Sequence, residues 1–207
     1  MKAFILMRKD ISFCFSWILV AVILTIIAPI YFIYMTDINR ILFEPVCLLS
    51  PLLGCNIVLS RICYIEDNYG TRKFLSTLPI TRSQKILSRY FVGFVFIVFF
   101  MLVAVCNAII VLDVSLHAKF LLIAISVGHI FEGLYLLFYY RWGVAVAQYA
   151  FLGTIGMFAV TYYIFDKINI PLLNITVNIA TGTILFLVSV VIYVISAFLS
   201  CIYEKNI

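Results

Sequence analysis

Apolar residues dominate this chain in six long runs, and short polar segments separate the runs. They cover about residues 12–34, 42–63, 90–112, 119–140, 144–165 and 176–202. Each run reaches roughly 20 residues, the length that a helix needs to cross a hydrocarbon core of about 30 Å. Apolar side chains occupy all faces of the runs, and in lipid each backbone amide must be satisfied within its own segment. The pattern predicts an all-α integral membrane protein with six transmembrane helices.

The composition agrees with a membrane protein. The chain is 66% hydrophobic and 11% charged, with a mean hydropathy of +1.20, far from the values of soluble domains. We therefore expect one transmembrane domain over residues 1–207, without room for a separate soluble catalytic domain. The six cysteines form no Cys-x-x-Cys pair, so we predict no metal site and interpret them as small packing residues.

The distribution of basic residues predicts the orientation, because Lys and Arg are retained on the cytoplasmic side of a membrane. With six spans, both termini share one side with eleven basic residues, and three lie on the other side. The eleven are Lys2, Arg8, Lys9, Arg61, Arg72, Lys73, Arg82, Lys85, Arg89, Arg141 and Lys205, and the three are Arg40, Lys119 and Lys167. Both termini are thus expected in the cytosol. The net charge of +5 then reflects topology and an anionic inner leaflet, and no nucleic acid is expected as a partner.

The first ten residues combine apolar and basic positions. Residues 1–10 include the apolar Phe4 and Ile5 and the basic Arg8 and Lys9. This arrangement fits a short amphipathic helix in the membrane interface. The alternative is a basic flank of the first span. No small-residue cleavage site of a signal peptide is expected here.

The longest polar segment, residues 64–89, follows the second apolar run. Within it, Phe74 and Leu78 are four residues apart, as a short surface helix with one apolar face requires. Pro79 ends such a helix. Thr81 and Gln84 then fit a capping box, so the third spanning helix is predicted to begin in the cytosol near Arg82. The alternative is a solvated loop with basic anchors.

Among the ionisable residues within the apolar runs, we single out Glu44, His129 and Glu132. Such residues usually face a partner helix or a water-filled cavity. His129 and Glu132 are three positions apart, so we expect their side chains to be able to form a hydrogen bond. The pair is interpreted either as a polar spot on a substrate path that attracts cationic or amphipathic cargo, or as an interhelical contact. Glu44 lies near the outer end of its run, where it can reach headgroup water.

Three stretches resemble ABC-2 type permeases, the membrane subunits of bacterial ABC exporters, and in particular their small six-helix group. The polar segment at residues 64–89, which we call the coupling loop after the loop it resembles, carries an acidic pair, Gly70-Thr71 and Leu75-Ser76-Thr77-Leu78-Pro79-Ile80-Thr81-Arg82. Glu132 to Gly143 is similar to the end of the fourth helix of that family, and Ser196 to Lys205 to its closing helix. The resemblance spans essentially the whole chain.

The resemblance implies an N-terminal elbow helix at residues 1–10, six transmembrane helices, and a coupling helix near Asp67 to Leu78 that docks in a groove of an ATPase. The residues implied in coupling are Glu66, Asp67, Tyr69, Gly70, Thr71, Arg72, Phe74, Leu75, Leu78, Pro79 and Arg82. The chain lacks a Gly-x-x-x-x-Gly-Lys-Ser/Thr motif, so no cofactor is expected on it. ATP and Mg²⁺ would bind to a separate cytosolic ATPase, present in two copies.

The same resemblance implies a second permease subunit, identical or paralogous, in a bacterial plasma membrane. The small size and the absence of an outer domain favour export of a peptide, toxin or drug-like amphipathic compound. One alternative is a non-transporting, permease-like immunity or sensor subunit. Another is an intramembrane enzyme that uses His129 and Glu132, but such enzymes need two or three convergent motifs, and this chain has two histidines.

Overall fold

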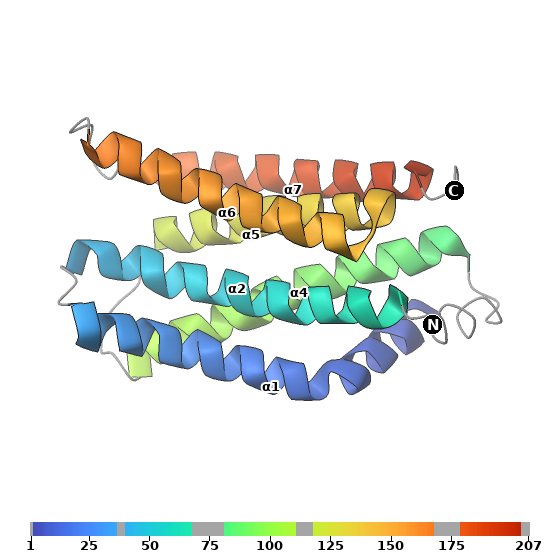
Figure 1. The fold of residues 1–207 in the computed structure, drawn as a ribbon, viewed down its shortest axis with the longest axis horizontal. Helices are drawn as coiled ribbons and strands as arrows, with labels where there is room; N and C mark the ends of the chain where they lie inside the picture. The colour runs from blue at the N-terminus through green and yellow to red at the C-terminus, as the bar shows by residue number, and fades with distance from the viewer. Residues whose placement is uncertain (1, 37–39, 68–80, 111–117, 168–178, 204–207) are drawn as a thin grey trace.

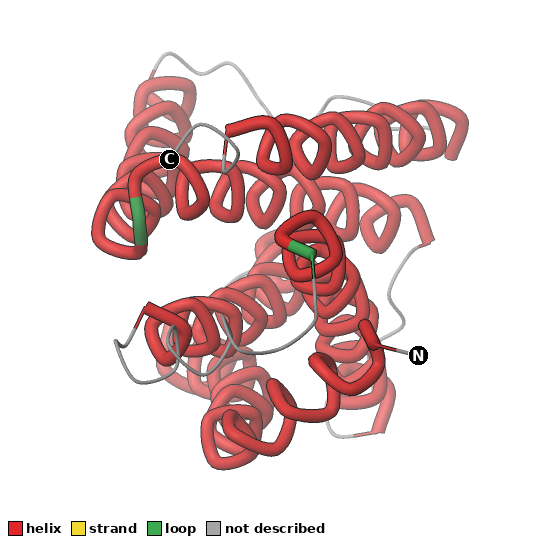
Figure 2. Tube along the Cα trace, turned by 90° about the vertical axis from the view of Figure 1, so that its right-hand side faces the viewer, coloured by secondary structure: helices red, strands yellow, loops and turns green. Residues whose placement is uncertain are grey.

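The computed structural model is a bundle of long helices (Figure 1). The structure describes residues 2–36, 40–67, 81–110, 118–167 and 179–203. The helices are α1 (Lys2–Thr36), α2 (Arg40–Asp67), α4 (Arg82–Ile110), α5 (Ala118–Trp142), α6 (Val144–Lys167) and α7 (Ile179–Tyr203). Outside them, the described part of the chain holds only Thr81 and Gly143 (Figure 2). The prediction of an all-α chain is confirmed.

Within the described part of the chain, four helices contain segments that are long and apolar enough to span a membrane. These segments are Arg8–Tyr31, Arg82–Ile110, Leu121–Trp142 and Ile179–Tyr203, and α6 carries a shorter apolar stretch at Val144–Gly156. The side chains that point away from the bundle fit a lipid environment. On α1 they form a stripe at helical spacing: Phe13, Trp17, Val20, Leu24, Ile27 and Tyr31 are all exposed. The chain is therefore a membrane protein.

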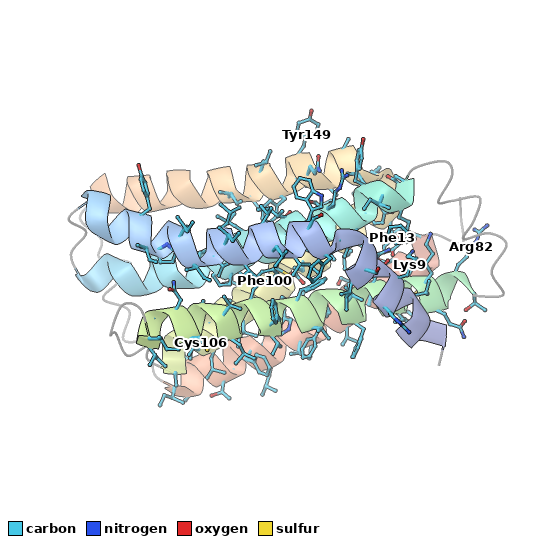
Figure 3. The ribbon with its side chains drawn as sticks, turned by 90° about the horizontal axis from the view of Figure 1, so that it is seen from below. Lys9, Phe13, Arg82, Phe100, Cys106 and Tyr149 are labelled. Atoms are coloured by element: carbon cyan, nitrogen blue, oxygen red, sulfur yellow. The ribbon has the colours of Figure 1, made fainter. Side chains whose placement is uncertain are left out.

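The predicted elbow at residues 1–10 is not a separate helix in this structure. Lys2 to Thr36 forms one uninterrupted α-helix, and its first turns lie at an angle to the rest, with the bend close to Lys9 and Phe13 (Figure 3). The start of α4 agrees with the sequence interpretation. The Thr81 hydroxyl accepts a hydrogen bond from the Gln84 amide at 3.3 Å, and the Gln84 side chain accepts one from the Thr81 amide at 3.2 Å. The predicted capping box is confirmed.

The bundle has two halves with different cores. Helices α1, α2 and α4 pack together, and α5 packs against α6 and α7 (Figure 1). The first core is aliphatic and aromatic, with Phe100 fully buried among Val58, Ile97 and their neighbours. The second core is rich in tyrosine: Tyr90, Tyr135, Tyr139, Tyr140 and Tyr193 are all buried.

Helices α5 and α6 meet at a turn of a single residue. Gly143 has φ = +88°, a left-handed conformation that side-chain-bearing residues rarely adopt. Its amide donates a hydrogen bond of 2.8 Å to the Tyr139 carbonyl, which ends α5, and its carbonyl accepts from Ala147, which starts α6. The turn brings α6 back beside α5. Figure 1 shows that the two chain ends lie at the same end of the bundle as this turn.

Candidate functional site

A cluster of charged side chains lies inside the bundle at the end that carries both chain termini. It comprises Asp10 on α1, Glu66 on α2, and Lys85 and Arg89 on α4; we call these four residues the ion cluster. Figure 3 shows Lys9 and Arg82, the sequence neighbours of this region, at that end of the molecule, with Cys106 at the other. The ion cluster thus joins the end of α2 to the start of α4, the two helix ends that flank residues 68–80 in the sequence.

Arg89 is the centre of the ion cluster. Its Nη1 lies 2.9 Å from Asp10 Oδ2, and its Nη2 contacts Glu66 Oε2. Lys85 Nζ lies 2.6 Å from Glu66 Oε1. The side chains of Arg89, Asp10 and Glu66 are at most 5% exposed, whereas that of Lys85 is 25% exposed. A guanidinium is the side chain best suited to bridge two carboxylates, because its planar fork presents several donors at once.

The arrangement ties both flanks of the coupling loop to α1. Glu66 is the second-last residue of α2, and Lys85 and Arg89 lie in the first two turns of α4. Asp10 lies in the first third of α1, so its contact with Arg89 connects that part of α1 to the helix ends. Lys9 Nζ lies 3.3 Å from Asp10 Oδ1. Any displacement of the helix ends at the loop must therefore move α1 as well or break buried charge pairs.

The predicted coupling residues fall into two groups. The first group lies outside the described residues, as does most of the predicted coupling helix; it consists of Tyr69, Gly70, Thr71, Arg72, Phe74, Leu75, Leu78 and Pro79. Glu66, Asp67 and Arg82 are described. Glu66 is 2% exposed and faces inward to Arg89, and Asp67 Oδ1 accepts a hydrogen bond of 3.4 Å from Tyr139. Arg82 is exposed at the start of α4.

A second polar group lies deeper, around Glu132 on α5. Glu132 Oε1 accepts a hydrogen bond from the Cys55 thiol on α2, and Oε2 has no hydrogen-bond partner among the described residues. A methyl group placed on Gly93 of α4 would lie 2.9 Å from Glu132 Oε2 and 2.9 Å from Tyr193 Oη. Glycine at position 93 therefore lets α4 approach both side chains, as small residues often do between membrane helices.

The expected hydrogen bond between His129 and Glu132 is wrong. The His129 ring, 1% exposed, stacks on Phe94 at a centroid distance of 5.4 Å with an interplanar angle of 7°. It also contacts the rings of Phe186 and Tyr193. Neither ring nitrogen has a hydrogen-bond partner among the described residues. Contacts across the bundle thus decide the orientation of both side chains.

Tyrosine hydroxyls link α4 to α5 and α7. Tyr193 on α7 donates a hydrogen bond of 2.6 Å to the Tyr90 carbonyl on α4. Tyr90 Oη lies 2.9 Å from Ser200 Oγ on α7 and 3.4 Å from the Gly133 carbonyl on α5. Each hydroxyl satisfies a polar group inside the bundle, which in lipid stabilises helix association.

Several of these residues carried no predicted role. Asp10, Lys85 and Arg89 counted only as topology signals or flanking charges, and Cys55 only as a packing residue. The available signal was the rarity of charge in this chain, since an ionisable residue near an apolar run usually has a partner. The sequence does not say which partner. Glu44 lies in α2, and its side chain is outside the described set.

The described residues contain no group of three or more His, Cys, Asp or Glu side chains that could hold a metal ion. Among their cysteines, Cys14, Cys55 and Cys63 are buried, Cys201 is half-buried and Cys106 is exposed. What the geometry offers is a set of buried polar contacts that link helices. Such contacts suit a bundle that must hold together and move as a unit.

Comparison with known proteins supplies the family. A family model described as ABC-2 family transporter protein matches residues 2–204, which includes every described helix. No curated protein and no solved structure gives a significant match. The family match agrees with the resemblance of the coupling loop and of the ends of α5 and α7. The chain is an ABC-2 family transporter membrane protein.

Proposed function

We propose that this chain is the permease subunit of an ABC exporter in a bacterial plasma membrane, with six spanning helices and both termini in the cytosol. The family match supports a transport subunit that is not itself catalytic. The basic residues support the orientation, because eleven of the fourteen lie on the side of the termini. ATP and Mg²⁺ bind to a separate cytosolic ATPase, two copies of which serve two permease subunits.

The observation that carries the coupling mechanism is the ion cluster. ATP binding draws the two ATPase subunits together, and a helix of the coupling loop seated in each one is displaced. Because Glu66 and Arg89 join the flanks of the loop to Asp10, that displacement reaches α1, α2 and α4 together. The bundle then tilts as a unit, a rigid-body transition between two states. The transported substrate is a peptide, toxin or drug-like amphipathic compound.

The experiment is reconstitution of the tagged chain with its ATPase in liposomes. ATP-dependent movement of a radiolabelled cationic peptide, with ATPase activity that the peptide stimulates at least about twofold, supports the proposal. An ATPase that binds the chain but moves no member of a panel of peptides, antibiotics and lipid-linked glycans favours the alternative of a sensor or immunity subunit. Failure of any ATPase to copurify contradicts the proposal. Intramembrane cleavage of the panel would support the enzyme alternative.

We further propose that Glu132 and His129 pack the bundle and do not select cargo. Both are buried among α2, α4, α5 and α7 within one chain. Glu132→Gln keeps the shape of the side chain and an oxygen for the Cys55 thiol. We expect this variant to transport at a rate within about twofold of wild type and to keep the same preference among cationic, neutral and anionic peptides.

A role of Glu132 in the substrate path would give a different result for Glu132→Gln. If the residue lines the substrate path, the variant loses its preference for cationic over neutral peptides while the ATPase activity without substrate is unchanged. Glu132→Leu serves as the matched comparison, because it removes the acceptor of the Cys55 thiol as well. Under the packing interpretation, Glu132→Leu lowers thermal stability by more than Glu132→Gln does.

A further inference from the structure

Arg61 lies near the same end of the bundle as the ion cluster but takes no part in it. Arg61 on α2 has its guanidinium carbon 5.1 Å from the ring centroid of Trp17 on α1 and 5.2 Å from that of Tyr64 on α2. No described carboxylate lies within ion-pair distance of Arg61: the described acidic partners at this end belong to Lys9, Lys85 and Arg89. Its Nε atom is buried without a hydrogen-bond partner among the described residues.

The two rings of this group are exposed on the surface of the bundle. Trp17 belongs to the exposed apolar stripe of α1 between Phe13 and Val20, and it is 39% exposed, while Tyr64 is 58% exposed. Arg61 lies six residues before the end of α2, which corresponds to about 9 Å along a helix. It therefore lies about as far from its helix end as Arg89 does from the start of α4, on the outer surface between α1 and α2.

The depth distinguishes Arg61 from the other stacked arginine. Arg141 also lies over two rings, those of Trp142 and Tyr203, at 4.3 and 4.6 Å. It is exposed and one residue from the end of α5, where water can solvate its charge. A guanidinium that lies farther from the helix end, against apolar neighbours, is costly in lipid unless an anion or water molecules bind to it.

We propose that Arg61, Trp17 and Tyr64 form a binding site for the phosphate of an anionic phospholipid on the surface between α1 and α2. The guanidinium supplies charge and paired donors for phosphate oxygens. The indole N–H and the phenol O–H add one donor each, and such rings favour the membrane interface. Acyl chains of the lipid lie along the apolar stripe of α1. The site is separate from the ATPase-coupling role and does not depend on it.

Native mass spectrometry of the full chain in detergent tests the site. Phosphatidylglycerol is titrated against phosphatidylcholine with the same acyl chains. The wild type is expected to bind phosphatidylglycerol more tightly. Arg61→Gln is expected to weaken that binding about fivefold, the effect of losing one basic residue at an anionic membrane surface. Arg8→Gln, which removes the same charge from an exposed position on α1, is expected to leave the tight site intact.

Two further variants keep the test valid if Arg61→Gln impairs folding. Tyr64→Phe and Trp17→Phe each retain an aromatic ring and remove one donor, so each is expected to weaken binding about two- to threefold. Four results would overturn the site: equal affinity for the two lipids, undiminished binding by Arg61→Gln, equal loss in Arg8→Gln, or displacement of the lipid by inorganic phosphate at the same concentration. The last result indicates a site for free anions.

Discussion

A Leu75→Asp variant is expected to abolish transport while the ATPase retains its basal activity. In the proposed mechanism, the apolar face of the coupling loop, with Phe74 and Leu75, fills a groove of the ATPase. A carboxylate at position 75 would have to leave water to enter that groove, and burial of an unpaired charge is strongly unfavourable. The docked helix is lost, and ATP hydrolysis no longer moves the bundle. The measurement is ATP-dependent peptide transport and ATPase activity in liposomes.

The matched control is Ser76→Asp, which adds the same charge to the neighbouring polar position of the same loop. It is expected to transport at a rate within about twofold of wild type. Both variants should show the thermal stability of the wild type, because neither position belongs to a predicted span. Normal transport with normal stimulation of the ATPase in Leu75→Asp would refute the assignment of the coupling loop, and equal loss in both variants would mean that charge alone disturbs it.

The elements that sequence predicts well are those fixed by nearby residues. The capping box of Thr81 and Gln84 depends on a spacing of three residues, and the structure contains both of its hydrogen bonds. The helical nature of the apolar runs follows from the need to satisfy each backbone amide within its own segment. Neither inference requires knowledge of which helices are neighbours.

The contacts of the candidate site cannot be predicted without knowing which helices are neighbours. Asp10 and Arg89 are 79 positions apart, and Cys55 and Glu132 are 77 apart. Glu66, which the family resemblance implies in coupling, pairs with Arg89 inside the chain. His129 and Glu132 are close in sequence, yet aromatic rings of α4 and α7 and a thiol of α2 determine their orientation. Local spacing makes such contacts possible but does not select among them.

The ion cluster connects the coupling loop to three helices, α1, α2 and α4. Glu66 and Lys85 are joined across the loop at 2.6 Å, so the two flanks are held close regardless of what lies between them. Arg89 then connects this closed base to α1 through Asp10. Separate motion of one flank would expose or unpair a buried charge, so the energetic preference is for joint motion.

An Arg89→Met variant is expected to lower the free energy of unfolding by about 3–5 kcal/mol, the cost of removing one partner of a buried charge pair. Met fills a similar volume, so the loss comes from Asp10 and Glu66, which stay buried without their guanidinium. The measurement is denaturant-induced unfolding in detergent, followed with a thiol-reactive dye. Cys14 and Cys63 are each at most 1% exposed and react only when the bundle opens.

Two companion variants separate charge pairing from other effects of Arg89→Met. Arg8→Met removes an exposed arginine of α1 and is expected to unfold like the wild type. Asp10→Asn and Glu66→Gln added to Arg89→Met remove the two carboxylates that lost their guanidinium partner. This triple variant should recover most of the lost stability, because replacing a buried ionic group is often neutral. It should still transport poorly, since neutral side chains no longer hold the loop flanks to α1. Recovery of full transport along with stability would show that the ion cluster stabilises the bundle without transmitting the motion of the loop.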